Sequence, residues 1–169
     1  FLNAMMGPAH HLPLVGDDDG GRVFHPYGER EKFGAVALAT CRLLFGGPGW
    51  AADRELAAEQ AAWWLGEVPG EAPEDGVNDG AAVFPDTGAV VLSPGPWWVL
   101  FDAGPFGPGR AGHSHSDTLS VVVRYQGHDV LIDPGTYTYT ADPPLRRWFR
   151  GSAAHNTLRV DGCDQAIQE

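Results

Sequence analysis

The spacing of apolar residues changes once along the chain, from a helical period to short strand-like runs. Residues 29–45 place apolar side chains such as Phe33 and Val36 near one face at the three-to-four-residue spacing of an amphipathic helix. The Gly- and Pro-rich residues 46–49 cannot continue that helix. The pattern therefore predicts a first helix that ends at Phe45.

A second helix is predicted from about Asp53 to Leu65. Asp53 suits the N-cap, because its carboxylate can accept hydrogen bonds from the free amides of the first turn. Trp63 and Trp64 are expected to complete the apolar face, and Gly66 to end the helix. Two helices joined by a Gly/Pro turn cannot bury both faces alone, so we expect the end of a larger helical domain.

Residues 67–80 are acidic and rich in Gly and Pro, which is typical of a linker. The β-prone runs that follow are 82–84, 89–92, 97–101, 118–125, 129–132 and 157–160. Tyr125-Gln126-Gly127-His128 suits a tight hairpin. We therefore predict an α+β chain: a helical segment over residues 1–66, a linker over 67–80, and an antiparallel sheet over 81–169 that forms one wall of an incomplete β-sandwich.

Composition and charge narrow the class of partner. The chain has 169 residues and is 43% hydrophobic, enough to bury a core. Its net charge of −11 argues against nucleic acids and anionic membrane surfaces. Residues 1–100 carry −9 and residues 101–169 only −2, so the second part suits an anionic ligand better. No apolar run is long enough to span a bilayer, and no signal-peptide pattern opens the chain.

The motif His113-Ser114-His115-Ser116-Asp117 is the clearest candidate for chemistry. On an extended backbone, alternate residues share a face, so His113, His115 and Asp117 are expected to point the same way. Two imidazoles on one face are a good start for a zinc-type site, which then needs ligands from elsewhere in the chain.

Asp133 and His155 are the predicted further ligands beside His115. Asp133 follows a strand-like run and His155 begins another, so the three residues come from three neighbouring elements. Such a site would couple metal binding to folding. Each residue also has a plainer interpretation: surface histidines for the His-x-His pair, a turn for Asp133-Pro134-Gly135, and a loop cap for His155.

The role of His113 stays open between two alternatives. It is either a second ligand beside His115, or it faces a bound molecule, where a group that titrates near neutrality can act as acid, base or charge partner. A cupin-like metal enzyme would need a glutamate shortly after the His-x-His pair. Residues 118–123 contain none.

A second candidate cluster follows at residues 137–150. Arg146, Arg147 and Arg150 lie beside Trp148 and Phe149. Guanidinium groups pair with carboxylates or sulfates, and aromatic faces stack on sugar rings. The alternative is a solvated loop anchored by a tryptophan. Two tyrosines upstream could line the same cleft or simply share one face of a strand; they are Tyr137 and Tyr139. The acidic run over residues 16–22 lacks the spacing of a calcium loop, which indicates a structured loop or a cleft-lining segment.

The sequence resembles the heparinase II/III-like family of polysaccharide lyases from about Ala81 to Gln165. The elements that carry the likeness are His-x-His-x-Asp, Asp-Pro-Gly-Thr-Tyr and His-Asn-Thr, in that order. The resemblance implies an (α/α) toroid joined to an antiparallel β-sandwich, with the active cleft between them. It also implies that His115, Asp133 and His155 bind a structural zinc, and that His113 helps to neutralise the carboxylate of a uronate.

The activity implied by the resemblance is β-elimination on an acidic, uronate-containing polysaccharide such as a glycosaminoglycan or alginate. Arg146, Arg150, Tyr137 and Tyr139 would then bind the substrate. The family's catalytic tyrosine and its Asn or His partner lie on helices further upstream, so we expect this chain alone to lack a complete active site. A periplasmic or secreted location would suit that substrate class. The alternative function is a non-catalytic, metal-stabilised carbohydrate-binding or structural module.

Overall fold

The computed structural model describes residues 1–18, 32–45, 54–66, 80–107 and 112–166. The chain divides into two compact units. The first unit comprises Phe1–Leu12 and Arg22–Asn78, and the second comprises Pro13–Gly21 and Asp79–Glu169. Residues 13–18 thus belong to the unit that contains the sheet, although they precede the predicted helices in the sequence. None of the described helices is long and apolar enough to cross a membrane.

The first unit is helical. It contains α1 (Leu2–Met6), the 3-10 turn η1 (Gly7–Ala9), α2 (Phe33–Phe45) and α3 (Arg54–Leu65). Helix α2 packs against α1 and α3. The start of the first predicted helix and its Gly/Pro end lie outside the described residues, as does the N-cap at Asp53.

The end of α3 is as predicted, but its apolar face is not. Gly66 has φ +70° and its amide donates to the carbonyl of Ala62, which closes the helix. Trp63 and Trp64 are exposed, whereas Ala61 is fully buried. Neighbouring positions on a helix are about 100° apart, so the two tryptophans cannot share one narrow buried stripe.

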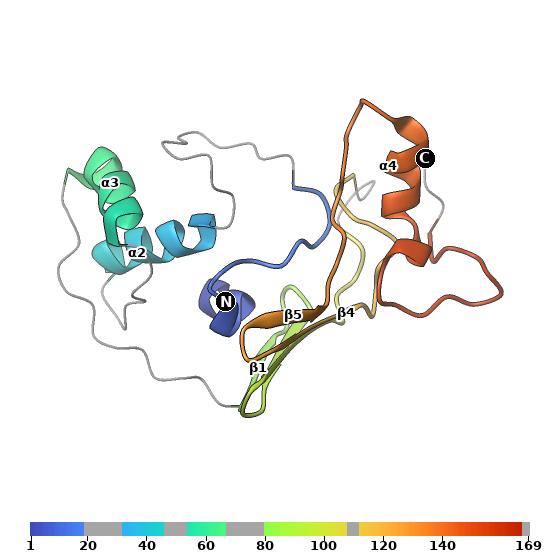
Figure 1. Ribbon diagram of the computed structural model, residues 1–169, viewed down its shortest axis with the longest axis horizontal. Helices are drawn as coiled ribbons and strands as arrows, with labels where there is room; N and C mark the ends of the chain where they lie inside the picture. The colour runs from blue at the N-terminus through green and yellow to red at the C-terminus, as the bar shows by residue number, and fades with distance from the viewer. Residues whose placement is uncertain (19–31, 46–53, 67–79, 108–111, 167–169) are drawn as a thin grey trace. The chain divides into compact units, whose positions relative to one another are not determined.

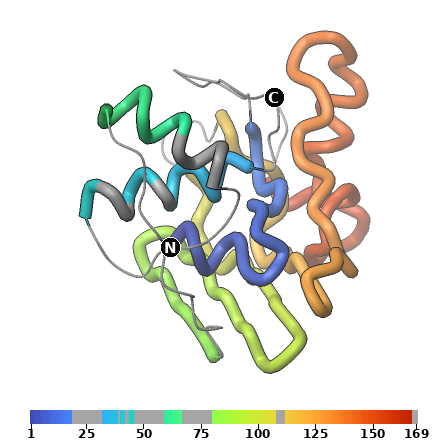
Figure 2. The backbone as a smooth tube through the Cα atoms, turned by 60° about the vertical axis from the view of Figure 1, so that its left-hand side comes forward, coloured from blue at the N-terminus to red at the C-terminus, as the bar shows by residue number. Residues whose placement is uncertain are grey.

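The second unit contains a five-stranded antiparallel sheet in the order β1-β2-β3-β4-β5. Its strands are β1 (Gly80–Phe84), β2 (Ala89–Ser93), β3 (Trp97–Asp102), β4 (Val121–Tyr125) and β5 (His128–Leu131). Each strand pairs with the next one along the chain, and the chain then continues into α4 (Pro143–Arg150) and the 3-10 turn η3 (Ser152–Ala154) (Figures 1 and 2). The predicted α+β class and antiparallel sheet are confirmed.

One face of the sheet forms the core of this unit. Val91 pairs with Leu100, and Leu100 with Val122, so alternate residues on three strands meet on the same face. Trp98 is fully buried opposite Arg124, whose guanidinium lies 4.7 Å from the centre of the indole ring. The period-2 pattern of these strands is therefore the pattern of a half-buried sheet.

The hairpin between β4 and β5 turns at Gln126 and Gly127, which have φ of +50° and +78°. Two consecutive positive φ values are what a two-residue turn between twisted strands requires. The predicted hairpin is confirmed.

Two predicted strand regions differ from the structure. The run 118–125 becomes a strand only at Val121, because Leu119 has φ +67° and the Ser120 amide turns back to the Asp117 carbonyl. The run 157–160 is no strand; Val160 forms one isolated bridge with Cys163. The motif residues 113–117 therefore lie in a loop, and alternation along a strand does not orient them.

Helix α4 was not predicted. It begins after Asp142, whose side chain accepts a hydrogen bond from the Leu145 amide at 3.0 Å, and Pro143 and Pro144 occupy its first positions. An Asp followed by prolines is a helix-start signal, because proline needs no hydrogen-bond partner in the first turn. The segment 145–150 is thus a helix with a defined start.

Candidate metal centre

The candidate site lies at the end of the sheet where β3 ends and β4 begins. The backbone of Asp102 bonds to Leu119 and Ser120, which holds the β3–β4 loop against the sheet. The Asn156 side chain donates to the carbonyls of Val121 and Ile132, so the segment after η3 is fixed to the same end. His115, Asp117, Asp133 and His155 are consequently brought together from separate parts of the chain.

Residues of α4 and η3 hold the β3–β4 loop in place through hydrogen bonds. The Ser116 amide donates to the Arg150 carbonyl at 2.8 Å, and the Ser152 hydroxyl donates to the Ser116 carbonyl at 2.7 Å. Ser116 and Ser152 are almost fully buried. These bonds fix the backbone on both sides of Ser116, which sets the directions of His115 and Asp117.

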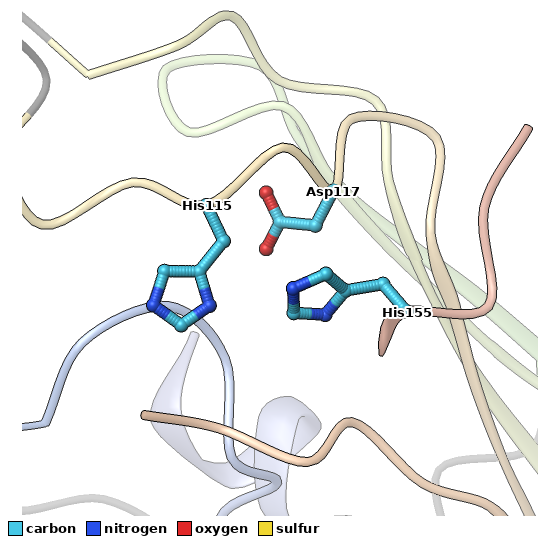
Figure 3. A group of neighbouring side chains, drawn as sticks. All are labelled: His115, Asp117 and His155. Atoms are coloured by element: carbon cyan, nitrogen blue, oxygen red, sulfur yellow. The ribbon is translucent and has the colours of Figure 1, made fainter. Parts of the chain in front are cut away.

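Three buried side chains converge at this end of the sheet: His115, Asp117 and His155. One ligand atom from each lies within 4.8 Å of the others, and they form the group among the described residues that could hold a metal ion. The two imidazole centres are 5.2 Å apart. Figure 3 shows the Asp117 carboxylate directed between the two rings.

Each of these histidines uses its other ring nitrogen to bond a carboxylate. His115 Nε2 lies 2.9 Å from Asp17 Oδ1, and His155 Nδ1 lies 2.8 Å from Asp133 Oδ2. Since a carboxylate only accepts, the proton is on those two nitrogens. Carboxylates on the far side of metal-binding histidines fix the tautomer and the direction of the ring.

The inward nitrogens are left with lone pairs and no partner. His115 Nδ1 and His155 Nε2 are buried and have no hydrogen-bond partner within the described part of the chain. Buried polar atoms without a partner are costly unless something else satisfies them. Two imidazole nitrogens and one carboxylate are donors that suit zinc. The residues present therefore fit a metal ion.

Burial and nearby charges shift the pKa values of this group in opposite directions. Burial lowers the pKa of His115 despite its bond to Asp17. Burial also acts to lower the pKa of His155, but the hydrogen bond and charge of Asp133 outweigh it and raise that pKa. Burial raises the pKa of Asp117 and of Asp102. Burial therefore removes water from the carboxylates of Asp117 and Asp102, and nearby hydrogen bonds and positive charges do not fully offset that loss.

Asp133 lies beside the group and not among its three members. It is 4% exposed, and its Oδ1 accepts a hydrogen bond from the Gly135 amide at 2.8 Å. This hydrogen bond belongs to the turn predicted from Asp133-Pro134-Gly135. Its Oδ2 is bonded to His155. The role of Asp133 as a ligand stays a prediction, and Asp117 is the carboxylate that the geometry adds.

His113 differs from His115 in its surroundings. Its side chain is 76% exposed, and its Nδ1 lies 3.6 Å from Asp17 Oδ2. His113 is thus open to solvent two residues away from a buried histidine of the centre. That position suits contact with a bound molecule better than a place inside the buried group.

The predicted substrate-binding arginines both have partners in the protein. Arg146 donates to both carboxylate oxygens of Asp17, and its guanidinium lies 4.5 Å from the centre of the Tyr139 ring. Arg150 donates to the Ser114 carbonyl at 3.1 Å. Their contact with a substrate stays a prediction.

Tyr137, Trp148 and Phe149 form an aromatic cluster in which Tyr137 and Trp148 are exposed and Phe149 is half-buried. Tyr137 is 69% exposed and stacks on Phe149 with ring centres 4.9 Å apart and planes 11° apart. Trp148 meets Phe149 edge-on and is 54% exposed. We call these three residues the aromatic face.

Comparison with known proteins places the chain in a family. The model for the heparinase II/III-like C-terminal domain matches residues 77–168. A crystal structure of heparinase III is 21% identical with a TM-score of 0.63, over 95% of this chain and 25% of that one. Heparan sulfate lyase HepC from Pedobacter heparinus is 19% identical with a TM-score of 0.59, over 95% and 23%.

These identities are low, so the solved structures establish the fold, and this chain spans about a quarter of their length. No curated protein sequence matches it. The family model, by contrast, covers more than half of the chain and includes His113, His115, Asp133 and His155. The chain therefore belongs to the heparinase II/III-like family of polysaccharide lyases.

Proposed function

We propose that this chain is part of a lyase that cleaves a uronate-containing polysaccharide by β-elimination, with a structural zinc at the end of its sheet. The observation that carries the proposal is the position of His113: it is exposed in the β3–β4 loop, which also carries His115 and Asp117 of the buried group. The family match supports the reaction class, and the two similar structures are of a heparan sulfate lyase and of heparinase III.

The reaction needs two proton transfers and one carboxylate contact. Neutralising the uronate carboxylate acidifies the adjacent C–H; a base removes that proton, a C=C bond forms, the glycosidic C–O bond breaks, and an acid protonates the departing oxygen. His113 is the group of this chain that we assign to the carboxylate, because its side chain is exposed beside the buried centre. The imidazole is accessible from solvent, as substrate contact requires.

The proposed zinc ligands include His115 through Nδ1 and His155 through Nε2, the two buried nitrogens without partners. Asp117 is the carboxylate that lies with them, and Asp133 remains the alternative ligand predicted from the sequence. When bound, the ion would cross-link the β3–β4 loop to the segment after η3 and balance two buried carboxylates. This chain's residues hold the ion, and His113 is left for the substrate.

Sugar contact is assigned to the aromatic face. Tyr137 and Trp148 are large and exposed, and amphipathic rings of this kind provide flat surfaces for pyranose rings. Tyr139 lies against Arg146, so these two predicted binding residues would act together at one edge of the surface. Arg150 would contribute its charge from the end of α4, where it is bonded to the loop.

The test uses the full-length parent protein, because we propose that its upstream helices supply the remaining proton-transfer groups. A uronate polysaccharide should yield an unsaturated, ultraviolet-absorbing product, and a neutral glucan should yield none. His113→Ala should lower kcat by about 100-fold or more, since a positioned acid–base or charge group typically contributes that much. His128→Ala, an exposed histidine on β5, is the matched control and should leave the rate unchanged.

Two outcomes would contradict the proposal. One is a parent protein that forms no unsaturated product from heparan sulfate, other glycosaminoglycans or alginate. The other is an equal rate in His113→Ala and His128→Ala. Binding of the polysaccharide without any turnover would favour the alternative, a non-catalytic module whose metal is only a structural link.

A further inference from the structure

The Asp17 carboxylate accepts hydrogen bonds from three side chains of the sheet-containing unit, although it lies before α2 and α3 in the sequence. It is 1% exposed. Its Oδ1 accepts from His115 Nε2 at 2.9 Å, from the Thr136 hydroxyl at 2.9 Å and from Arg146 Nη1 at 2.6 Å. Its Oδ2 accepts from Arg146 Nη2. One carboxylate thus joins the β3–β4 loop, the segment after β5, and α4.

The backbone around Asp17 is fixed as firmly as its side chain. The Asp17 amide donates to the His113 carbonyl at 3.0 Å. Gly16 has φ +62°, and a Cβ there would lie 2.9 Å from that same carbonyl, so only glycine allows this approach. A Cβ at Gly135 would lie 3.1 Å from Leu14 Cβ, so the Leu14 side chain lies close to the turn that contains Asp133. In Figure 1 this blue segment runs beside the orange chain that follows β5.

We infer that Asp17 is a positioning residue for the metal centre: it holds the Nε2–H of His115, so that Nδ1 faces Asp117 and His155. The two hydrogen bonds from Arg146 make this arrangement rigid, because a bidentate guanidinium group fixes the plane of the Asp17 carboxylate. His115 and His155 would then present opposite ring nitrogens to the ion, Nδ1 and Nε2 respectively.

The family match begins at residue 77 and does not include Asp17. The sequence between Asp17 and His115 spans 98 positions, so the pair is joined only by the fold. The segment over residues 13–18 is therefore part of the centre even though it precedes the matched domain. The zinc part of this inference rests on the proposed function, whereas the tautomer of His115 does not.

The first test is the tautomer of His115 in the metal-free 169-residue chain, read from its ring nitrogens by long-range ¹H–¹⁵N NMR. The wild type should show the Nε2–H form. Asp17→Asn should lose that preference, because an amide oxygen that Arg146 also uses is a weaker acceptor than a carboxylate. Asp18→Asn makes the same change of charge at the exposed next residue and should keep the Nε2–H form.

An Nδ1–H tautomer in the wild type, or an unchanged Nε2–H tautomer in Asp17→Asn, would overturn the inference. A merely structural ion pair between Asp17 and Arg146 would not move this signal. If the wild type binds no zinc, the proposed metal centre fails, and the tautomer still decides the role of Asp17. The two failures are therefore distinguishable.

The second test is the zinc affinity, measured by competition with a chromophoric chelator. Asp17→Asn should weaken zinc binding by about 10- to 100-fold, the usual effect of removing an outer partner of a metal-binding histidine. Asp18→Asn should bind as the wild type does. Equal affinities of Asp17→Asn and the wild type would contradict the assignment.

Arg146→Lys provides a milder variant if Asp17→Asn does not fold. It keeps the positive charge but replaces the planar fork by a single ammonium, so the carboxylate is held less firmly. We expect a loss of zinc affinity of several-fold, about tenfold at most, with the metal-free fold retained by circular dichroism. An unchanged affinity in a folded Arg146→Lys protein would also overturn the inference.

Discussion

The buried centre and the aromatic face belong to the same unit but differ in their exposure to solvent. In the centre, His115, Asp117 and His155 are buried, and the two histidines keep ring nitrogens without hydrogen-bond partners among the described residues. On the aromatic face, Tyr137 and Trp148 leave more than half of their surface in solvent. On the proposed function, an ion would complete the centre, whereas a larger ligand would cover the aromatic face. Changes in the centre should therefore alter stability and metal content, and changes on the aromatic face should alter substrate binding.

The largest effect is expected from His155→Ala. It removes one partner of a buried histidine–carboxylate pair and leaves Asp133, which is 4% exposed, without that bond. Breaking such a pair costs about 3–5 kcal/mol in the free energy of unfolding. Chemical denaturation of the metal-free chain measures it. His128→Ala should change stability by less than about 0.5 kcal/mol, and a similar small change in His155→Ala would show that the pair is not structural.

The second prediction ranks the two carboxylates near the centre. Asp117→Asn should reduce zinc affinity more than Asp133→Asn, because Asp117 lies with the inward nitrogens and Asp133 bonds the outer nitrogen of His155. Loss of an outer partner costs about 10- to 100-fold in affinity, and loss of a ligand should cost more. Competition titration measures both. The reverse order would return Asp133 to the set of ligands predicted from the sequence.

The third prediction is a pH dependence of opposite sign with and without zinc. The pKa of His155 is raised in the fold, so in the metal-free protein its contribution to stability is fully present below pH 6.5 and is lost as the pH rises through the raised value. Zinc needs a neutral imidazole, so its affinity should increase over the same rise in pH. Unfolding midpoints at several pH values, with zinc and with chelator, test this. Parallel curves would contradict it.

The smallest effect on stability is expected on the aromatic face. Trp148→Ala should change the free energy of unfolding by about 1 kcal/mol or less, because the ring is more than half exposed. In the full-length parent it should raise KM for the polysaccharide several-fold, since an aromatic contact contributes about 0.5–1.5 kcal/mol. Trp97→Ala, at an exposed position on β3, is the control and should leave KM unchanged. Equal KM values in the two variants would remove the aromatic face from the substrate site.

Local signals account for the parts of the fold that the sequence predicted. The turn at Gln126 and Gly127 and the alternation around Trp98 depend on neighbouring residues, and both were recognisable. The start of α4 was also encoded locally, in Asp142 and the two prolines, but the charged segment after it indicated a loop. The loop conformation of residues 113–117 was not predictable from spacing, because it depends on hydrogen bonds of the Ser116 backbone to the Arg150 carbonyl and the Ser152 hydroxyl.

The centre itself was predictable only in part. His115 and His155 were chosen from their motifs, and both are in the buried group. The sequence predicts only an acidic loop around Asp17, because nothing in a run of three aspartates distinguishes the one that meets a histidine 98 positions later. Asp117 was expected to share a face with His115, but its place between two imidazoles depends on His155, which comes from another part of the chain.

The central claim is that the buried group holds a metal ion, and metal analysis of the purified chain tests it most directly. After equilibration with zinc and removal of the excess, the wild type should retain about one zinc per chain, as three protein ligands would hold it. His115→Ala should retain almost none, and His128→Ala should match the wild type. Equal zinc in the wild type and His115→Ala would contradict the account.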